Sequence, residues 1–282
     1  MANLKTLIIG ANGQLGRALQ KEFPEAECVD RTTFDLSDPA IVTSRNWREY
    51  SLILNAAAYT AVDQAESPEG KIEAERTNAI APGYLAKISN DAEVTVVHIS
   101  TDYVFDGTKS PHTEDEEFNP LSVYGETKAK GDTAISAAKK HYIIRTSWVI
   151  GEGKNFVLTM KGLAEKGVKP NVVNDQMGRL TFTTDLAKGI KHLVDNKAPF
   201  GTYNLTNDGE SVSWADIARK VYELTGHNAA DITDVTTAEY YAGKEGIAPR
   251  PLQSTLSLDK IKAIGFQPRD WQQALTEYLK KI

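Results

Sequence analysis

Cysteine is almost absent from this chain of 282 residues, which contains only Cys28. A single cysteine excludes a disulfide bond within the chain and fits a reducing compartment. Because Cys28 lies in the apolar stretch 26–29, we expect it to be a small packed side chain. Stability must then come from a packed core, and 282 residues are enough for a full α/β core.

Long apolar runs and an excess of positive charge are also missing. No apolar run approaches the roughly 20 residues of a membrane span. Acidic residues outnumber basic ones by 38 to 32, for a net charge of −6, which argues against broad attraction to nucleic acid or to anionic membranes. The five histidines show no H-x-x-x-H or comparable metal-ligand spacing. We therefore expect a soluble, cytoplasmic protein with no nucleic-acid or membrane partner.

Strand-like and helix-like segments alternate in the first half of the chain. Apolar runs predict strands at 4–9, 27–30, 51–56, 94–100 and 142–149, and helices are predicted near 39–48, 69–89 and 124–139. This alternation is typical of an α/β fold of the Rossmann type, a doubly wound parallel sheet with helices on both faces.

The regular alternation weakens after about residue 151. Helices are predicted over 155–166 and 184–194, from Ser213 to Gly226, and after Asp270. We expect a dinucleotide-binding domain over 1–150, rejoined by about 180–205. The region 151–282 would then form mainly a smaller, C-terminal substrate-binding lobe, with a cleft for ligand between the two.

A glycine-rich turn follows the first predicted strand. Gly10, Gly13 and Gly16 stand in the pattern G-x-x-G-x-x-G and open a predicted helix. Gly10 permits a tight turn, Gly13 permits close approach of a pyrophosphate to the backbone, and Gly16 permits close packing of helix and strand. The free N–H groups of the helix N-terminus would then face phosphates. We expect Asn12, Gln14 and Leu15 to belong to the same cofactor site.

Other short segments follow later strands at the same edge of the sheet, where ligands collect in an open parallel sheet. Asp30 can bond a ribose 2′-hydroxyl, whereas the adjacent Arg31 can hold a 2′-phosphate, so the choice between NAD and NADP stays open. The remaining predicted cofactor residues are Asp35, Leu36, Ala56, Ala57, Ala58, Tyr59, Tyr124 and Lys128.

Tyr124 and Lys128 are four residues apart, which places both side chains on one face of a helix. An ammonium near a phenol favours the phenolate, so the phenol exchanges a proton more easily near neutral pH. A hydroxyl from the end of a preceding strand, that of Thr101, would complete a site for proton transfer to a carbonyl. The same spacing also occurs by chance in many helices.

With these segments, the chain resembles the extended short-chain dehydrogenases and, within them, the dTDP-4-dehydrorhamnose reductases. The resemblance runs from about residue 4 to 279. The less specific stretches are GANGQLG at Gly10 and YGETK at Tyr124. The more specific ones are STDYVFDG at Ser100, RTSWV at Arg145 and NDQMGR at Asn174, in this order. The other matching stretches are NAAAYTAVDQAE at Asn55, KNFVLTM at Lys154 and RPLQSTLSL at Arg250.

The resemblance implies a role for each site residue. Tyr124 would donate a proton to the C4 carbonyl oxygen of dTDP-4-dehydro-L-rhamnose as nicotinamide delivers hydride. Lys128 would lower the tyrosine pKa and hold the nicotinamide ribose, and Thr101 would hydrogen-bond the reacting oxygen. The substrate would also be contacted by Asp102, Trp148, Asn174, Gln176, Arg179 and Arg250, the last as a clamp on the pyrophosphate.

The resemblance also bears on cofactor, metal and assembly. We expect NADPH as cofactor, with NADH also used. Some relatives carry a glutamate early in the first helix as part of a magnesium-dependent dimer contact, but residues 16–19 hold no carboxylate. A metal site is therefore doubtful, and both a monomer and a homodimer remain open.

Three other functions are possible on the same scaffold. A nucleotide-sugar dehydratase needs an acid/base pair after the threonine, usually Thr-Asp-Glu, but Tyr103 stands in place of the glutamate. An epimerase needs only the tyrosine and lysine, so the segments specific to the reductases argue against it. A non-catalytic, NADP-binding regulatory subunit would not need the complete set Thr101, Tyr124 and Lys128.

Overall fold

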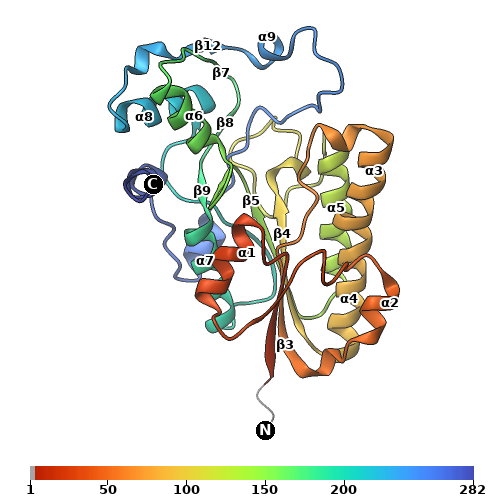
Figure 1. The fold of residues 1–282 in the computed structure, drawn as a ribbon. Coiled ribbons are helices and arrows are strands. Elements are labelled where there is room, and N and C mark those ends of the chain that lie inside the picture. Colours follow the sequence, from red (N-terminus) through yellow and green to blue (C-terminus); the bar gives the residue numbers. More distant parts are fainter. Residues whose placement is uncertain (1–3) are drawn as a thin grey trace.

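The computed structural model describes residues 4–282 of the chain (Figure 1). A six-stranded sheet stands at its centre, in the order β10-β5-β4-β3-β1-β2, and every neighbouring pair is parallel. The strands are β1 (Lys5–Ile9), β2 (Glu27–Val29), β3 (Tyr50–Asn55), β4 (Thr95–Thr101), β5 (His141–Thr146) and β10 (Gly201–Asn204). The predicted α/β class with a Rossmann-type parallel sheet is confirmed.

Helices cover both faces of this sheet (Figure 1). On one face α1 (Gln14–Glu22) packs beside α7 (Thr183–Asp195), over a core that includes Leu19 and Ile190. On the other face lie α3 (Pro68–Glu75), α4 (Ala81–Ala92) and α5 (Val123–Ser136), with α2 (Pro39–Ser44) near the edge. The two-faced burial explains why the strands read as continuous apolar runs in the sequence.

The predicted helix 69–89 is interrupted by a π-helical segment, η3 (Arg76–Ile80), between α3 and α4. Asn78 lies in this segment and is buried. Its side-chain amide donates to the Tyr59 carbonyl oxygen (3.1 Å) and to Thr127 Oγ1 (3.2 Å), and it accepts from the Tyr59 backbone N–H (2.9 Å). The π segment thus joins the loop after β3 to helix α5.

The strand predicted over 142–149 is shorter than expected. It ends at Thr146 because Trp148 has a left-handed backbone conformation (φ 46°), which cannot continue a strand. Residues Val149–Ile150 instead form β6, which pairs with β9 (Thr181–Phe182). The reversal at Trp148 turns the chain away from the sheet and into the second lobe.

The second lobe is built around its own core. Helices α6 (Phe156–Glu165), α8 (Trp214–Leu224) and α11 (Trp271–Lys280) enclose a cluster that includes Tyr222 and the buried Trp271. A capping box fixes the start of α8, since the side chains of Ser213 and Asp216 accept hydrogen bonds from each other's backbone N–H groups. The remaining elements of this half are β7 (Asn171–Val173), β8 (Met177–Gly178), β11 (Val212–Ser213), β12 (Thr233–Val235), α9 (Thr237–Tyr241) and α10 (Asp259–Ala263).

Four short 3₁₀ turns complete the chain: η1 (Trp47–Glu49), η2 (Gln64–Glu66), η4 (Asp102–Val104) and η5 (Ala229–Asp231). Cys28 was expected to be packed, and this was wrong: its side chain is exposed. The reason is its position on β2, which is the edge strand of the sheet. Within residues 4–282, none of the helices has the length and apolar character needed to cross a membrane.

Candidate active site

The glycine-rich turn brings three chain segments into close contact. Gly10 has φ +80°, and a Cβ there would lie 2.6 Å from the backbone nitrogen of Ala57. A Cβ on Gly16 would lie 2.2 Å from the Gly10 carbonyl oxygen. Both positions therefore require glycine, as the sequence predicted for the tight turn and for helix–strand packing. The result is a backbone cradle at the carboxyl ends of β1 and β3.

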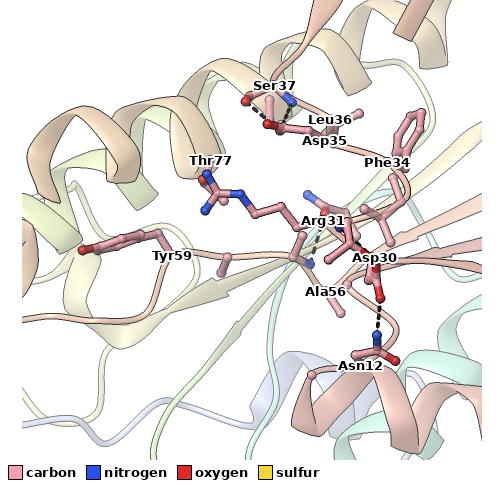
Figure 2. Close-up of a pocket in the computed structure, with 18 residues that line it drawn as sticks. Asn12, Asp30, Arg31, Phe34, Asp35, Leu36, Ser37, Ala56, Tyr59 and Thr77 are labelled. Atoms are coloured by element: carbon pink, nitrogen blue, oxygen red, sulfur yellow. Dashed lines mark hydrogen bonds between the residues drawn. The ribbon is translucent and has the colours of Figure 1, made fainter. Parts of the chain in front are cut away.

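A pocket of about 400 Å³ opens beside this cradle, and we call it the sheet-edge pocket (Figure 2). It is formed by the segments that follow β1, β2 and β3. Of the residues predicted to bind a dinucleotide, those that line it are Gly10, Asn12, Gly13, Asp30, Arg31, Asp35, Leu36, Ala56, Ala57, Ala58 and Tyr59. Small side chains at 56–58 leave the backbone accessible, which suits a planar or phosphate-bearing ligand.

The charged end of the sheet-edge pocket holds Asp30 and Arg31. The Asp30 carboxylate accepts from the Asn12 amide and from the Thr32 hydroxyl. The hydrogen bond from the Thr32 side chain, followed by those from the Thr33 and Thr32 backbone N–H groups, lowers the pKa of Asp30. Arg31 forms an ion pair with Glu73, and 63% of its side chain is exposed. The Asp30 carboxylate is thus held in place by hydrogen bonds, whereas the largely exposed Arg31 side chain beside it can change position.

Some predicted cofactor residues lie outside this pocket. Leu15 is buried in the core between sheet and α1, and the side chain of Gln14 accepts a hydrogen bond from the Gly151 N–H (2.7 Å). Sequence reasoning also missed several lining residues: Asn55, Thr32, Phe34, Ser37, Thr77 and Ala81. Asn55 is the first residue of the segment NAAAYTAVDQAE, which the sequence analysis had identified. Nothing in the helical pattern of 69–89 indicated Thr77, which lies in the π segment and lines the sheet-edge pocket.

Thr101 and Tyr124 are both buried at the end of β4. Thr101 is the last residue of that strand, and its hydroxyl donates to Asp102 Oδ1 (3.1 Å). Tyr124 stands in the first turn of α5, where Ser122 caps the helix and Glu66 accepts from the Val123 N–H (2.9 Å). The start of the helix is thus fixed from two sides, which fixes the position of the phenol.

The Tyr124 phenol is protonated in this environment. Burial raises the pKa of Tyr124 well above its usual value, and the interaction with the Thr101 side chain lowers it only in part. Lys128 is not among the groups that shift it. A protonated phenol is the form that can donate a proton to a carbonyl oxygen.

Lys128 is 1% exposed, and its ammonium donates to the backbone carbonyl of Ile99 (2.5 Å). Its Nζ also lies 3.4 Å from His98 Nε2. Burial lowers the pKa of Lys128 to about 8, while the nearby Asp132 carboxylate raises it. The ammonium is therefore directed at β4 rather than at the tyrosine, one helical turn from the phenol.

Asp102 is buried beside Thr101. Burial raises the pKa of its carboxyl to about 6, and the side chains of Ser254 and Thr101 lower it only in part. Its second oxygen, Oδ2, has no hydrogen-bond partner among residues 4–282. A buried oxygen without a partner is an acceptor that a ligand hydroxyl could use.

A second pocket, which we call the aromatic pocket, lies between the sheet and the second lobe. It contains Trp148 and Arg250 of the predicted substrate residues, together with Gln176. The rings of Trp148 and Trp214 are stacked with centroids 3.8 Å apart. The sequence did not indicate that the other aromatic lining residues contact substrate; these are Tyr103, Phe156, Trp214, Tyr240 and Tyr241. Tyr103 also contacts Tyr124 edge-on, with ring centroids 5.5 Å apart, so it connects this pocket to the phenol.

Arg250 forms an ion pair with Asp63. Its Nη2 donates to both carboxylate oxygens of Asp63, at 2.8 and 2.9 Å. The guanidinium also lies over the Tyr241 ring, 4.8 Å from its centroid. Arg250 is thus held at the mouth of the aromatic pocket by a residue from the first half of the chain.

Among the other predicted substrate residues, Gln176 lines the aromatic pocket, whereas Asn174 and Arg179 line neither pocket. Asn174 is exposed, and the Gln176 amide donates to Thr237 Oγ1 (3.0 Å). Arg179 is buried, where it donates to the Leu256 carbonyl and lies 3.5 Å from Asp208. Among residues 4–282 there is no group of three or more His, Cys, Asp or Glu side chains arranged to hold a metal ion.

Comparison with known proteins matches residues 4–282 to the family described as RmlD substrate binding domain. The chain is 39% identical to the spore coat polysaccharide biosynthesis protein SpsK of Bacillus subtilis, over 98% of this chain and 97% of that protein. It is 38% identical to the dTDP-4-dehydrorhamnose reductase of Aggregatibacter actinomycetemcomitans, over 96% and 97% of the two chains. A crystal structure of the dTDP-4-dehydrorhamnose reductase of Bacillus anthracis in complex with NADP superimposes with a TM-score of 0.90, at 32% identity and 99% coverage of both chains.

Proposed function

Since the chain belongs to the dTDP-4-dehydrorhamnose reductase family, we propose that it reduces the C4 ketone of dTDP-4-dehydro-L-rhamnose to give dTDP-L-rhamnose, with NADPH as cofactor. Several relatives carry the name of this reductase, and the structure of one of them holds NADP. The enzyme would then act as an oxidoreductase in the supply of rhamnose for polysaccharides.

The observation that carries this proposal is the position of Thr101 and Tyr124. Both are buried at the carboxyl end of β4, next to the strand end that opens into the sheet-edge pocket, and Tyr103 connects Tyr124 to the aromatic pocket. We assign the sheet-edge pocket to the dinucleotide and the aromatic pocket to the dTDP-sugar. The half of the chain that forms the sheet would thus bind cofactor and the second lobe substrate.

The residues of the sheet-edge pocket fit a nicotinamide dinucleotide. Close backbone packing at Gly10 and Gly16 places the glycine-rich turn directly before the N-terminus of α1, where free N–H groups favour phosphate. Asp30 is placed to accept from a ribose hydroxyl. When bound, the nicotinamide would supply the hydride to the C4 carbon of the sugar.

The protein's own groups would handle the negative charge that develops on the C4 oxygen. Tyr124, kept protonated by burial, would donate its phenolic proton to this oxygen. The Thr101 hydroxyl would donate a hydrogen bond to it, and the Lys128 ammonium would add electrostatic support from one helical turn away. Asp102 Oδ2 would accept from a sugar hydroxyl, and Trp148 would pack against the sugar ring.

The function is tested by following the oxidation of NADPH, and separately of NADH, at 340 nm. The substrate is dTDP-4-dehydro-L-rhamnose, also called dTDP-4-keto-6-deoxy-L-mannose. We expect substrate-dependent oxidation and dTDP-L-rhamnose as product. Cofactor binding without turnover would favour the regulatory-subunit alternative. Conversion of a dTDP-sugar without net oxidation of the cofactor would favour the epimerase or dehydratase.

Cofactor preference should depend on Arg31. We expect the wild-type enzyme to use both cofactors with a modest preference for NADPH, because Asp30 favours a free 2′-hydroxyl while Arg31 offers a partner to a 2′-phosphate. Arg31→Ala should shift the ratio of kcat/KM values towards NADH. Arg48→Ala, an exposed arginine outside the sheet-edge pocket, is the matched control. A ratio that stays unchanged in Arg31→Ala would show that Arg31 does not contact the cofactor.

Turnover should not require a divalent metal. Hydride transfer from NADPH to a ketone needs only a proton donor and electrostatic support for the oxygen, which Tyr124, Thr101 and Lys128 can supply. The first turn of α1 contains no acidic residue. After dialysis against EDTA, activity and apparent mass in gel filtration should be the same as before. Activity that is lost and then restored by magnesium would contradict this expectation.

A further inference from the structure

A group of buried charged and polar side chains lies next to Lys128. It consists of His98 on β4, Asp132 one turn further along α5, and Arg145 on β5. Their exposed fractions are 0%, 1% and 4%, and none of them lines either pocket. Charged groups are rarely buried unless something compensates them, and the proposed reaction steps do not use these three residues.

Arg145 holds Asp132 in place. Its Nε donates to Asp132 Oδ2 (3.1 Å), and its Nη1 donates to the Glu114 carbonyl oxygen (2.9 Å). The guanidinium also lies over the rings of Phe105 and Phe118, at 5.2 and 5.0 Å from their centroids. Arginine keeps its proton at any pH at which proteins fold, so its positive charge lowers the pKa of the Asp132 carboxyl and opposes the increase that burial causes.

The other oxygen of Asp132 faces the surroundings of Lys128. Asp132 Oδ1 lies 4.0 Å from His98 Nε2, and no hydrogen-bond partner for it is found within residues 4–282. Lys128 Nζ lies 3.4 Å from the same His98 nitrogen. On the far side of the ring, His98 Nδ1 is 3.1 Å from the Asn55 amide. One imidazole nitrogen is therefore approached by both the ammonium and the carboxylate.

The imidazole itself contributes no charge. Burial, and then the charge of Lys128, lower the pKa of His98 well below its usual value, so the ring is neutral. Other charged groups on elements packed against α5 have partners of their own. Glu75 on α3 pairs with Lys130 at the surface, and Arg76 on η3 pairs with Glu73 and Asp35. Glu66 on η2 accepts from the Val123 N–H, and Asp102 on η4 accepts from the Thr101 hydroxyl. Within the described part of the chain, Asp132 is then the one carboxylate that acts on the Lys128 ammonium.

We propose that Asp132, fixed by Arg145, is a positioning residue of the active site: it acts through Lys128 by keeping that buried side chain charged, and both groups lie close to the same ring nitrogen of His98. The role rests on the proposed function, in which Lys128 must be an ammonium. It is consistent with two opposing effects on the pKa of Lys128: burial lowers this pKa to about 8, and Asp132 raises it. Without Asp132 the ammonium would lose its proton at a lower pH.

The coupling can be measured without any substrate. In protein labelled with ¹³C at lysine Cε, the Lys128 resonance is identified by its absence in Lys128→Arg and titrated by NMR. We expect the wild-type residue to titrate near pH 8. In Asp132→Asn the midpoint should fall by about 1 pH unit or more, as expected when a neighbouring opposite charge is removed. Asp132→Glu, which keeps the charge, should restore it towards the wild-type value.

Kinetics supply the second readout. The alkaline limb of the kcat/KM profile with NADPH should move down in pH by the same amount in Asp132→Asn, so that the loss of activity is large at pH 8 and small near pH 6. A loss that is uniform at all pH values, together with an unchanged Lys128 midpoint, would overturn the proposal. Such a result would give Asp132 a purely structural role.

Asp132→Asn leaves a buried guanidinium without its partner, which can prevent folding. The double variant Asp132→Asn/Arg145→Gln removes the pair as a whole, and it should show the same lowered Lys128 midpoint. An unchanged midpoint in the double variant would also overturn the proposal. If the midpoint shifts but the wild-type protein does not reduce the dTDP-sugar, the coupling stands and the proposed function fails.

Discussion

Tyr124→Phe should lower turnover by roughly 10²–10⁴-fold, which is the usual contribution of a positioned proton donor. The substitution removes only the phenolic oxygen. The ring would keep its edge-on contact with Tyr103, and α5 would keep its caps, so the fold and the binding of NADPH should be nearly unchanged. The measurement is steady-state NADPH oxidation, with cofactor affinity from fluorescence titration.

A suitable control is Tyr222→Phe. The Tyr222 hydroxyl donates to the Val168 carbonyl (2.9 Å) in the core of the second lobe, far along the chain from the site. Its loss tests for the general effect of removing a buried hydroxyl. If Tyr124→Phe retained activity within about threefold of the wild type, Tyr124 could not be the proton donor, because such a donor contributes at least roughly 10²-fold.

Lys128→Met should affect both turnover and cofactor binding. Methionine approximates the length of lysine but carries no charge, and the proposed ammonium contact with a ribose hydroxyl would be lost. A hydrogen bond to a charged group is worth about 1.5–3 kcal/mol, so NADPH should bind roughly 10–100-fold more weakly. The dissociation constant and kcat are measured on the same preparation.

Lys130→Met is the matched control for this change. Lys130 lies two residues further along α5, with its side chain 46% exposed and paired with Glu75 and Glu126. We expect it to behave like the wild type. If Lys128→Met lowered kcat but left the NADPH dissociation constant unchanged, Lys128 would act on the reaction without holding the ribose.

The strands and the glycine-rich turn were predictable because their signals are local. Parallel strands buried on both faces give short apolar runs, and the left-handed conformation at Gly10 is one that glycine adopts without strain. The end of β5 could not be predicted in this way. Trp148 adopts positive φ although it is not glycine, and this conformation is stabilised by packing against Trp214 and Gly178, which lie far away in the sequence.

The composition of the site was predictable only in part. Residues that follow successive strands, such as Asp30 and Ala57, come together because the sheet edge brings them together. The pairing of Arg250 with Asp63 joins positions 187 residues apart, and no pattern in either segment points to the other. The direction of Lys128 depends in the same way on buried partners from other elements. Long-range packing, rather than local propensity, decides these contacts.

The π segment η3 changes which face of the helix each side chain within residues 68–92 occupies. Each residue in an α-helix advances about 100° around the axis, and a π turn accommodates one extra residue per turn without ending the helix. Thr77 and Asn78 are adjacent in sequence, yet one lines the sheet-edge pocket and the other bonds Tyr59 and Thr127. Deletion of one residue from η3 would restore a regular α-helix. The side chains before the deletion would then turn by about 100° around the helix axis relative to those after it. An alignment or graft that treats 68–92 as a uniform α-helix would therefore place one of these two side chains on the wrong face.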